Sequence, residues 1–157
     1  MSTLYPAIID RLDDWFTSDW YWMLMIAPFS PDTGSQVFVD DISADEATAP
    51  GYSRVLVTNK TITSVFPTEM PQYNQDDPDF GAPSGGQVAL YLVLYVEVTD
   101  DSDSVLAGAW PTNLNLDGTS QVVRFLPQIG PAGDQNPDMT WLLTGQVNHF
   151  NLLESSD

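Results

Sequence analysis

The segment QVALYLVLYVEV at residues 87–98 constrains the fold of this chain more than any other segment. Successive side chains of a strand point to opposite faces, and here both faces are apolar over most of their length. One face carries Val88, Leu90, Leu92, Leu94 and Val96. The other face carries Ala89, Tyr91, Val93, Tyr95 and Glu97. We therefore expect a central strand between two layers, or between a sheet and a partner chain.

The neighbouring segments predict a hairpin and further strands. The polar turn TDDSDS (99–104) leads into VLAGAW (105–110), which predicts a hairpin with the central strand. The run WYWMLMIA (20–27) is apolar on both faces and predicts a second buried strand. Shorter strand candidates lie at 36–42, 121–126 and 139–143.

Two longer segments separate these strands. Residues 54–65 are rich in β-branched side chains and predict one long strand, with a hairpin turning at Asn59-Lys60 as the alternative. Residues 67–86 contain four prolines and several Asp, Gly and Ser residues, which predicts a loop without regular structure. A loop of about 20 residues inside a domain is often a binding or assembly element.

The two ends of the chain complete the expected fold. Residues 1–18 predict a short amphipathic helix, because apolar side chains recur at helical spacing from Leu4 to Phe16. Residues 145–157 predict a last edge strand or a tail. Six to eight short strands after one helix favour a single all-β domain over residues 1–157, of the β-sandwich or jelly-roll type.

The charge of the chain is strongly unbalanced, with 22 acidic against 4 basic residues and a net charge of −18. Such a surface repels itself over about 8–10 Å in physiological salt and over about 3 Å in molar salt. Because the acids are dispersed in doublets such as Asp13-Asp14 and Asp40-Asp41, we expect a salt-adapted surface in preference to an acidic tail. Nucleic acid is not expected as a partner, since that affinity comes mainly from Lys and Arg.

Other composition features exclude further classes of site. The chain has no cysteine, which removes disulfides, thiolate catalysis and cysteine-ligated metal sites. No stretch approaches 18 uninterrupted apolar residues, so a membrane span is not expected.

Four segments together resemble a family of small virion structural proteins of tailed viruses, described as capsid decoration, head-fibre or minor tail proteins. These segments are LYPAIIDRL, DWYWMLMI, GYSRVLVTNKTIT and ALYLVLYVEVTDDSDSVLAGAW, and they lie within residues 4–26, 51–64 and 88–110. The chain departs from the family pattern at 67–86 and after Asn113. The resemblance brings no catalytic residues.

This resemblance implies a virion protein that docks on the major capsid protein or on tail proteins, and that forms a homo-oligomer, with a trimer as one expected form. Together with the acidity, it implies a virus of a halophilic host. A tail or baseplate component that binds a receptor or glycan is the alternative.

Enzymatic readings find little support in the residue pattern. His149 is the only histidine, and neither G-x-S-x-G nor a phosphate-binding loop occurs. A glycosidase needs two carboxylates, for which Glu97 opposite Asp40 or Asp41 is the best pair. With 22 acids in the chain, some pair always looks suitable, so we expect no enzyme and no cofactor.

A structural metal ion is the one cofactor that the acids suggest. Asp100, Asp101 and Asp103 could offer oxygen ligands to Ca²⁺ or Mg²⁺, although their spacing does not match an EF-hand loop. The competing interpretation is a solvated hairpin tip, and both interpretations apply equally to the acids of residues 76–79.

Aromatic residues gather in two places and are candidate interface anchors, because Trp and Tyr dominate binding hot spots. We expect part of each group to lie in the core and the rest to contact a partner. The candidates are Trp15, Trp20, Trp22, Phe66, Tyr73 and Phe80.

Overall fold

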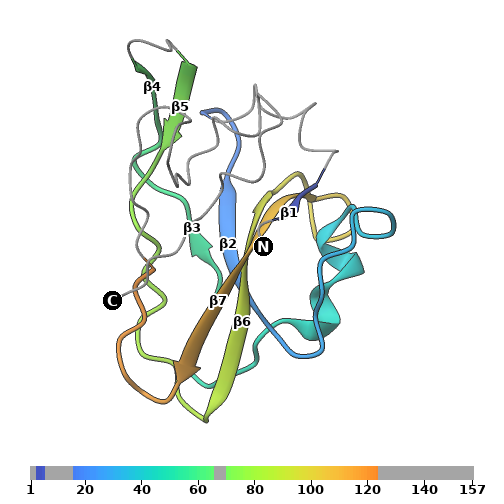
Figure 1. Ribbon diagram of the computed structural model, residues 1–157, viewed down its shortest axis with the longest axis vertical. Helices are drawn as coiled ribbons and strands as arrows, with labels where there is room; N and C mark the ends of the chain where they lie inside the picture. Colours follow the sequence, from blue (N-terminus) through green and yellow to red (C-terminus); the bar gives the residue numbers. More distant parts are fainter. Residues whose placement is uncertain (1–2, 6–15, 66–69, 124–157) are drawn as a thin grey trace.

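The computed structural model describes residues 3–5, 16–65 and 70–123, which form mostly antiparallel strands with almost no helix (Figure 1). Five strands make the main sheet in the spatial order β1–β7–β6–β2–β3, and two more make a separate ribbon. The strands are β1 (Thr3–Leu4), β2 (Trp20–Ile26), β3 (Val55–Leu56), β4 (Thr61–Val65), β5 (Met70–Asn74), β6 (Gln87–Val96) and β7 (Val105–Leu116). The prediction of a mostly β fold is confirmed. Among the described strands, the second sheet is only the β4–β5 ribbon, so a sandwich or jelly roll is not confirmed.

The predicted hairpin is present and forms the centre of the main sheet. Strand β6 pairs with β7 from Gln87↔Leu116 to Val96↔Val105, so β7 extends beyond its predicted end at residue 110. The turn between them is closed by Ser104, whose Oγ accepts from the Val98 N–H at 3.1 Å and donates to the Asp100 carbonyl at 2.7 Å. The predicted buried strand at 20–27 is also confirmed, because β2 lies on the other side of β6.

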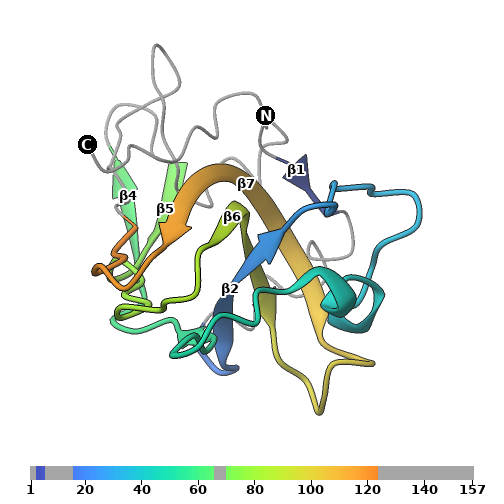
Figure 2. The same ribbon diagram turned by 90° about the horizontal axis from the view of Figure 1, so that it is seen from below.

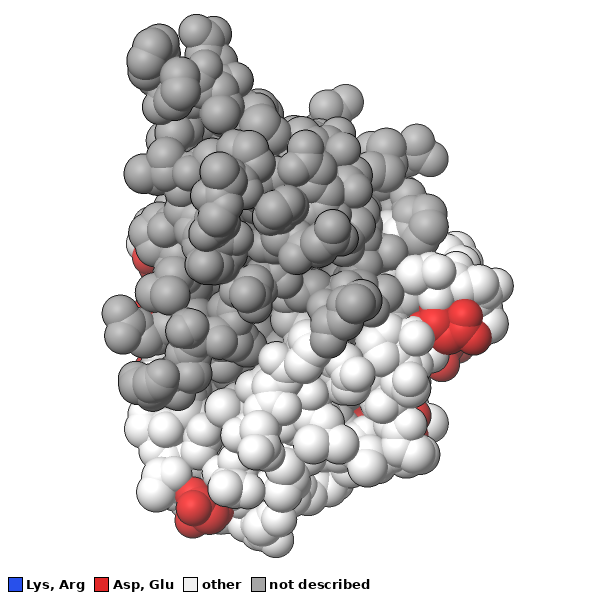
Figure 3. Space-filling view, in the orientation of Figure 1, with Lys and Arg blue, Asp and Glu red and all other residues white. Residues whose placement is uncertain are grey.

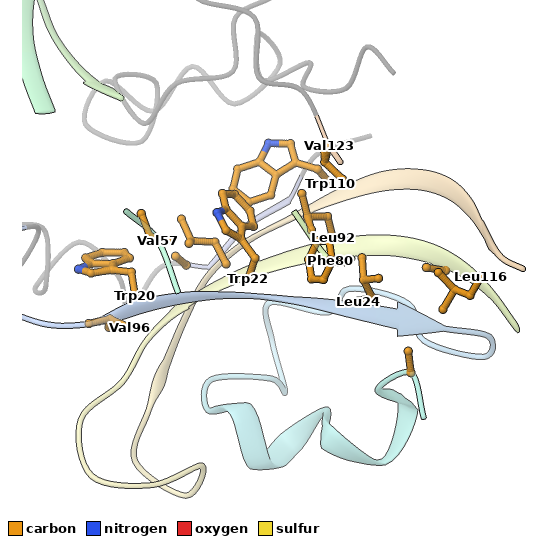
Figure 4. Close-up of a cluster of buried hydrophobic side chains, with 14 of the residues drawn as sticks. Trp20, Trp22, Leu24, Val57, Phe80, Leu92, Val96, Trp110, Leu116 and Val123 are labelled. Atoms are coloured by element: carbon orange, nitrogen blue, oxygen red, sulfur yellow. The ribbon is translucent and has the colours of Figure 1, made fainter. Parts of the chain in front are cut away.

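Both faces of the main sheet are buried within the chain itself. One face, here called the tryptophan face, carries Trp20, Trp22, Leu24, Leu92, Leu94, Val96 and Trp110. The opposite face, here called the tyrosine face, carries Met23, Met25, Val93, Tyr95 and Leu106 beneath Tyr5, Phe29, Val39 and Ile42. Figure 4 shows the tryptophan face on one side of the sheet and the helical segment on the other. Of the two predicted environments for the central strand, burial between two layers of the same chain is therefore the one observed.

The helical segment replaces the strand that was predicted at 36–42. It consists of two 3-10 helices, η2 (Val39–Asp41) and η3 (Ser43–Asp45), which lie against the tyrosine face (Figure 2). Only Phe38 pairs with the sheet, through a single bridge to Val105. The Asp41 carboxylate accepts from the backbone N–H groups of Val37 and Phe38 at 2.9 Å each, which turns the chain away from the extended conformation.

The segment 54–65 is neither one long strand nor a hairpin. Its first part is β3, which pairs with β2, and its second part is β4, which pairs with β5 in the ribbon. The break is at Asn59, which has φ of +53°. The Asp76 carboxylate accepts from Thr58 Oγ1 at 2.8 Å and from Asn59 Nδ2 at 2.6 Å, which holds this turn.

The prediction that 67–86 is a loop is wrong for part of its length. Strand β5 lies inside it and pairs with β4 from Thr61↔Asn74 to Val65↔Met70. Pro71 is compatible with this position because β5 is at the edge of the two-stranded ribbon. Residues 75–86 have the predicted irregular conformation, and residues 66–69 lie outside the described part.

The expected N-terminal helix is wrong at its start, where Thr3 and Leu4 pair with Ala109 and Gly108 of β7. Residues 6–15 lie outside the described part, as do the predicted strand at 139–143, the predicted tail at 145–157 and His149. In the predicted strand 121–126, the described residues form only a bridge between Val122 and Asp79. In the described ranges, no helix is long and apolar enough to cross a membrane.

Candidate functional site

A cluster centred on Arg54 joins three segments at one end of the tyrosine face. Glu46 follows η3 and is held beside β2 by a bridge to Met25. Arg54 immediately precedes β3, so its side chain reaches Glu46 on one side and the β6–β7 turn on the other. Asp101 lies in that turn, and Tyr95 lies on β6. We call Glu46, Tyr52, Arg54, Tyr95 and Asp101 the Arg54 cluster.

All five N–H donors of the Arg54 guanidinium have an acceptor in this cluster. Nε and Nη2 donate to Oε2 and Oε1 of Glu46 at 2.8 and 2.7 Å. Nη1 and Nη2 donate to Oδ1 and Oδ2 of Asp101 at 2.8 and 3.0 Å. The second hydrogen of Nη1 goes to the Tyr95 hydroxyl at 3.0 Å. One guanidinium therefore binds two carboxylates in a bidentate manner.

Two tyrosines extend the cluster into the sheet. The Tyr52 hydroxyl donates to Glu46 Oε2 at 2.7 Å and accepts from the Leu24 N–H of β2 at 3.1 Å. Burial and the nearby Glu46 charge raise the pKa of Tyr52 well above its ordinary value, so it stays protonated. The Arg54 guanidinium lies 5.4 Å from the centroid of the Tyr95 ring, which stacks on Tyr21 at 5.7 Å. Burial raises the pKa of Tyr95 to about 12.

The pairing of Arg54 with Asp101 favours the charged form of both side chains. The hydrogen bonds from Arg54 lower the pKa of Asp101, and those to Glu46 and Asp101 raise the pKa of Arg54. The side chains of Arg54, Glu46 and Asp101 are 24%, 15% and 40% exposed, so water reaches the pairs and screens them in part. A guanidinium with every donor engaged has none left for an anionic ligand, so this arrangement is a cross-link.

The proposed metal ligands are not brought together by the hairpin turn. Asp100 Oδ1 accepts from the Ser102 N–H at 2.8 Å, and Asp103 Oδ1 accepts from the N–H groups of Thr99 and Asp100 at 2.9 and 3.0 Å. Asp101 instead faces Arg54. Across the residues that the structure describes, no group of three or more His, Cys, Asp or Glu is arranged to hold a metal ion.

All three carboxylates of the candidate glycosidase pairs lie in the described part of the chain. The Asp41 carboxylate accepts from the backbone N–H groups of Phe38 and Val37, which lower its pKa. Burial and the nearby Glu97 charge raise the pKa of Tyr21. Asp40 is exposed, and its backbone N–H donates to the Asp101 carbonyl at 2.9 Å.

Three of the aromatic interface candidates lie in the core instead. Trp20, Trp22 and Phe80 are 0%, 1% and 4% exposed and belong to the tryptophan face, so they present no surface to a partner. Trp15 and Phe66 lie outside the described residues, and for Tyr73 only its backbone position opposite Ile62 is described. Among the side chains that the structure describes, the large apolar ones that are exposed are Phe16, Phe38, Leu56, Val88, Val98 and Val122.

No family model, no curated protein and no solved structure matches this chain. Its function is therefore inferred from its fold, its charge and the Arg54 cluster. The GYSR segment, which contains Tyr52 and Arg54, is part of the family resemblance, but the sequence pattern did not predict this cluster. Two features of the sequence pointed to Arg54: the chain has only four basic residues, and Arg54 directly precedes the apolar run VLV.

Proposed function

We propose that this protein is a non-enzymatic virion structural protein of a tailed virus, which decorates or extends the capsid by self-association and by docking on another virion protein. The observation that carries the proposal is the state of the GYSR segment, which is part of the family resemblance. Tyr52 and Arg54 of this segment bind groups of the same chain, and the five Arg54 donors are all used. Because Tyr52 and Arg54 stabilise the fold of their own chain, their role is structural, as expected of a protein that is assembled into a particle.

The architecture of the sheet supports the same role. Both faces of the main sheet are covered by apolar layers of the same chain, which gives a rigid body with loops on its outside. The finer proposal is a sandwich-like or jelly-roll-like fold. Its support is that the tryptophan face is as fully buried as the tyrosine face, as expected of a sheet in the interior of a two-layered β domain.

The distribution of charge supports an assembly module that works in concentrated salt. Figure 3 shows a face on which the described carboxylates lie in separate places among uncharged residues. Dispersed carboxylates at a net charge of −18 repel other copies unless dissolved ions screen them. We therefore propose a virion of a halophilic host as the location.

Contacts between copies would use apolar side chains that the fold leaves outside. Phe16 is 58% exposed, and Leu56 and Val98 are 42% and 41% exposed. Single exposed apolar residues are common on protein surfaces, so their part in assembly needs a direct test.

The test is to locate the chain in an electron-microscopy map of the source particle, and to measure by light scattering the mass of the recombinant protein in molar KCl. We expect density on the capsid and a homo-oligomer that binds particles lacking the chain. Phe16→Asp and Leu56→Asp should weaken association, whereas Thr48→Asp, at another exposed position, is the matched control for the added charge.

A protein that stays monomeric and binds neither capsids nor tails would contradict the proposal. Density at the tail tip together with glycan binding by the isolated protein would replace it with a receptor-binding role.

A further inference from the structure

We propose that the Arg54 cluster is an electrostatic latch that holds two acidic segments together and thereby lowers the salt concentration that the fold requires. The segments are 39–46, which includes both 3-10 helices, and 100–104 in the β6–β7 turn. This inference concerns the stability of the fold and does not depend on the virion role.

The two acidic segments lie directly against each other. Segment 39–46 contributes four carboxylates, which are Asp40, Asp41, Asp45 and Glu46, and segment 100–104 contributes three, which are Asp100, Asp101 and Asp103. Two backbone hydrogen bonds join them, from the Val39 N–H to the Ser104 carbonyl at 3.0 Å and from the Asp40 N–H to the Asp101 carbonyl at 2.9 Å. Such a junction concentrates like charge at one end of the sheet, so repulsion opposes it.

Arg54 supplies the opposing attraction. Its guanidinium lies between Glu46 of the first segment and Asp101 of the second and binds both in a bidentate manner. The other basic side chain of the described residues, Lys60, donates elsewhere, to the Ser18 carbonyl at 2.7 Å. Arg54 therefore joins the two acidic segments by a contact within the chain, where dissolved cations would otherwise have to reduce the repulsion.

Salt acts differently on the two forces. Repulsion between carboxylates several ångströms apart in water is strong in dilute salt and is screened within about 3 Å in molar salt. The contacts of Arg54 are short and partly buried, so screening weakens them less. The contribution of the latch to the stability of the fold should consequently be largest at low salt concentration.

The test compares two variants with the same change in charge. Asp101→Asn removes one bidentate partner of Arg54, whereas Asp40→Asn removes an exposed carboxylate of the same junction. The urea midpoint of unfolding is measured in molar KCl and at the lowest KCl concentration at which the wild-type chain is folded. We expect Asp40→Asn to raise the midpoint in low KCl, because it reduces the repulsion. Asp101→Asn should lower it, and by a larger shift in low KCl than in molar KCl.

A third variant separates geometry from charge. Arg54→Lys keeps the positive charge but cannot bind two carboxylates in a bidentate manner, so its midpoint in low KCl should also fall. In molar KCl, hydrogen exchange at the Asp40 amide should be faster in Asp101→Asn than in the wild type, with amides of β6 unchanged.

Three results would overturn the latch. The first is a shift of Asp101→Asn in low KCl in the same direction as Asp40→Asn, which would mean that the number of charges alone matters. The second is an Arg54→Lys midpoint equal to that of the wild type. The third is loss of the whole fold of Asp101→Asn at every KCl concentration, which a local latch would not cause.

Discussion

The ring of Trp110 lies against the backbone of Gly108 on strand β7, so that a Cβ atom at residue 108 would come within 2.6 Å of Cη2 and 3.0 Å of Cζ3 of the indole. This close approach lets Trp110 lie over the sheet and contact Trp22 of β2, with ring centroids 5.5 Å apart (Figure 4). The two tryptophans fill the middle of the tryptophan face. The absence of a side chain at Gly108 is therefore a packing requirement of the core.

Gly108→Ala should destabilise the fold by about 1–3 kcal/mol, because the added methyl group overpacks a rigid indole. The free energy of unfolding in molar KCl, from a urea titration, measures the effect. Gly34→Ala is the matched control, since a Cβ there meets only Asp32 Oδ1 at 3.3 Å in an exposed loop. Equal effects of the two substitutions would show that the Trp110 contact is unimportant.

Trp22→Ala should cost about 3–5 kcal/mol in free energy of unfolding, because it removes a side chain that is 1% exposed from the core. Phe16→Ala should change that free energy by at most about 0.5 kcal/mol, because Phe16 is 58% exposed. Urea titration of both variants under the same salt conditions tests this. A small loss for Trp22→Ala would return Trp22 to the class of interface anchors.

Asp41→Ala should destabilise the fold by about 1 kcal/mol, since two N–H groups at the entry to η2 lose their acceptor. Hydrogen exchange at the Val37 and Phe38 amides should become faster. The control is Asp40→Ala, one position earlier, whose side chain is exposed. If both alanines have the same effect, the carboxylate of Asp41 does not hold this turn.

The pH dependence of stability should change in Asp101→Asn. Arg54 lowers the pKa of Asp101 below its ordinary 3.8, so this carboxylate stabilises the fold above about pH 4 and loses that contribution as the pH falls through the lowered value. Because Asp101 is 40% exposed, we expect a difference from the wild type of about 1 kcal/mol at pH 7. Urea titrations between about pH 7 and pH 2 should show that difference shrinking in acid. A difference that is constant with pH would contradict the pairing.

The hairpin of β6 and β7 could be predicted because its pattern is local. Alternation along 87–96 shows two apolar faces, and the polar residues 99–104 mark the turn. A turn at Asn59-Lys60 is the alternative prediction for residues 54–65, but which strands its two halves pair with depends on the conformation of Asn59. Its positive φ is held by Asp76, which is 17 positions further along the chain, and propensity within 54–65 carries no information about that contact.

The candidate site was predicted poorly for a related reason. The strand expected at 36–42 failed because Asp41 offers its carboxylate to nearby N–H groups, which competes with pairing in a sheet. Asp100, Asp101 and Asp103 looked like one ligand set because they are adjacent in sequence, yet each carboxylate has its own partner in the folded turn.

By itself, the sequence determined the mostly β fold, the strand that is covered on both faces and the large negative charge. Each of these depends only on composition or on the period of side chains along one strand. Tertiary structure alone decided that Trp20 and Trp22 belong to the core and that Arg54 binds Glu46 and Asp101. Those partners are 8 and 47 positions from Arg54, and such contacts exist only once the sheet brings the segments together.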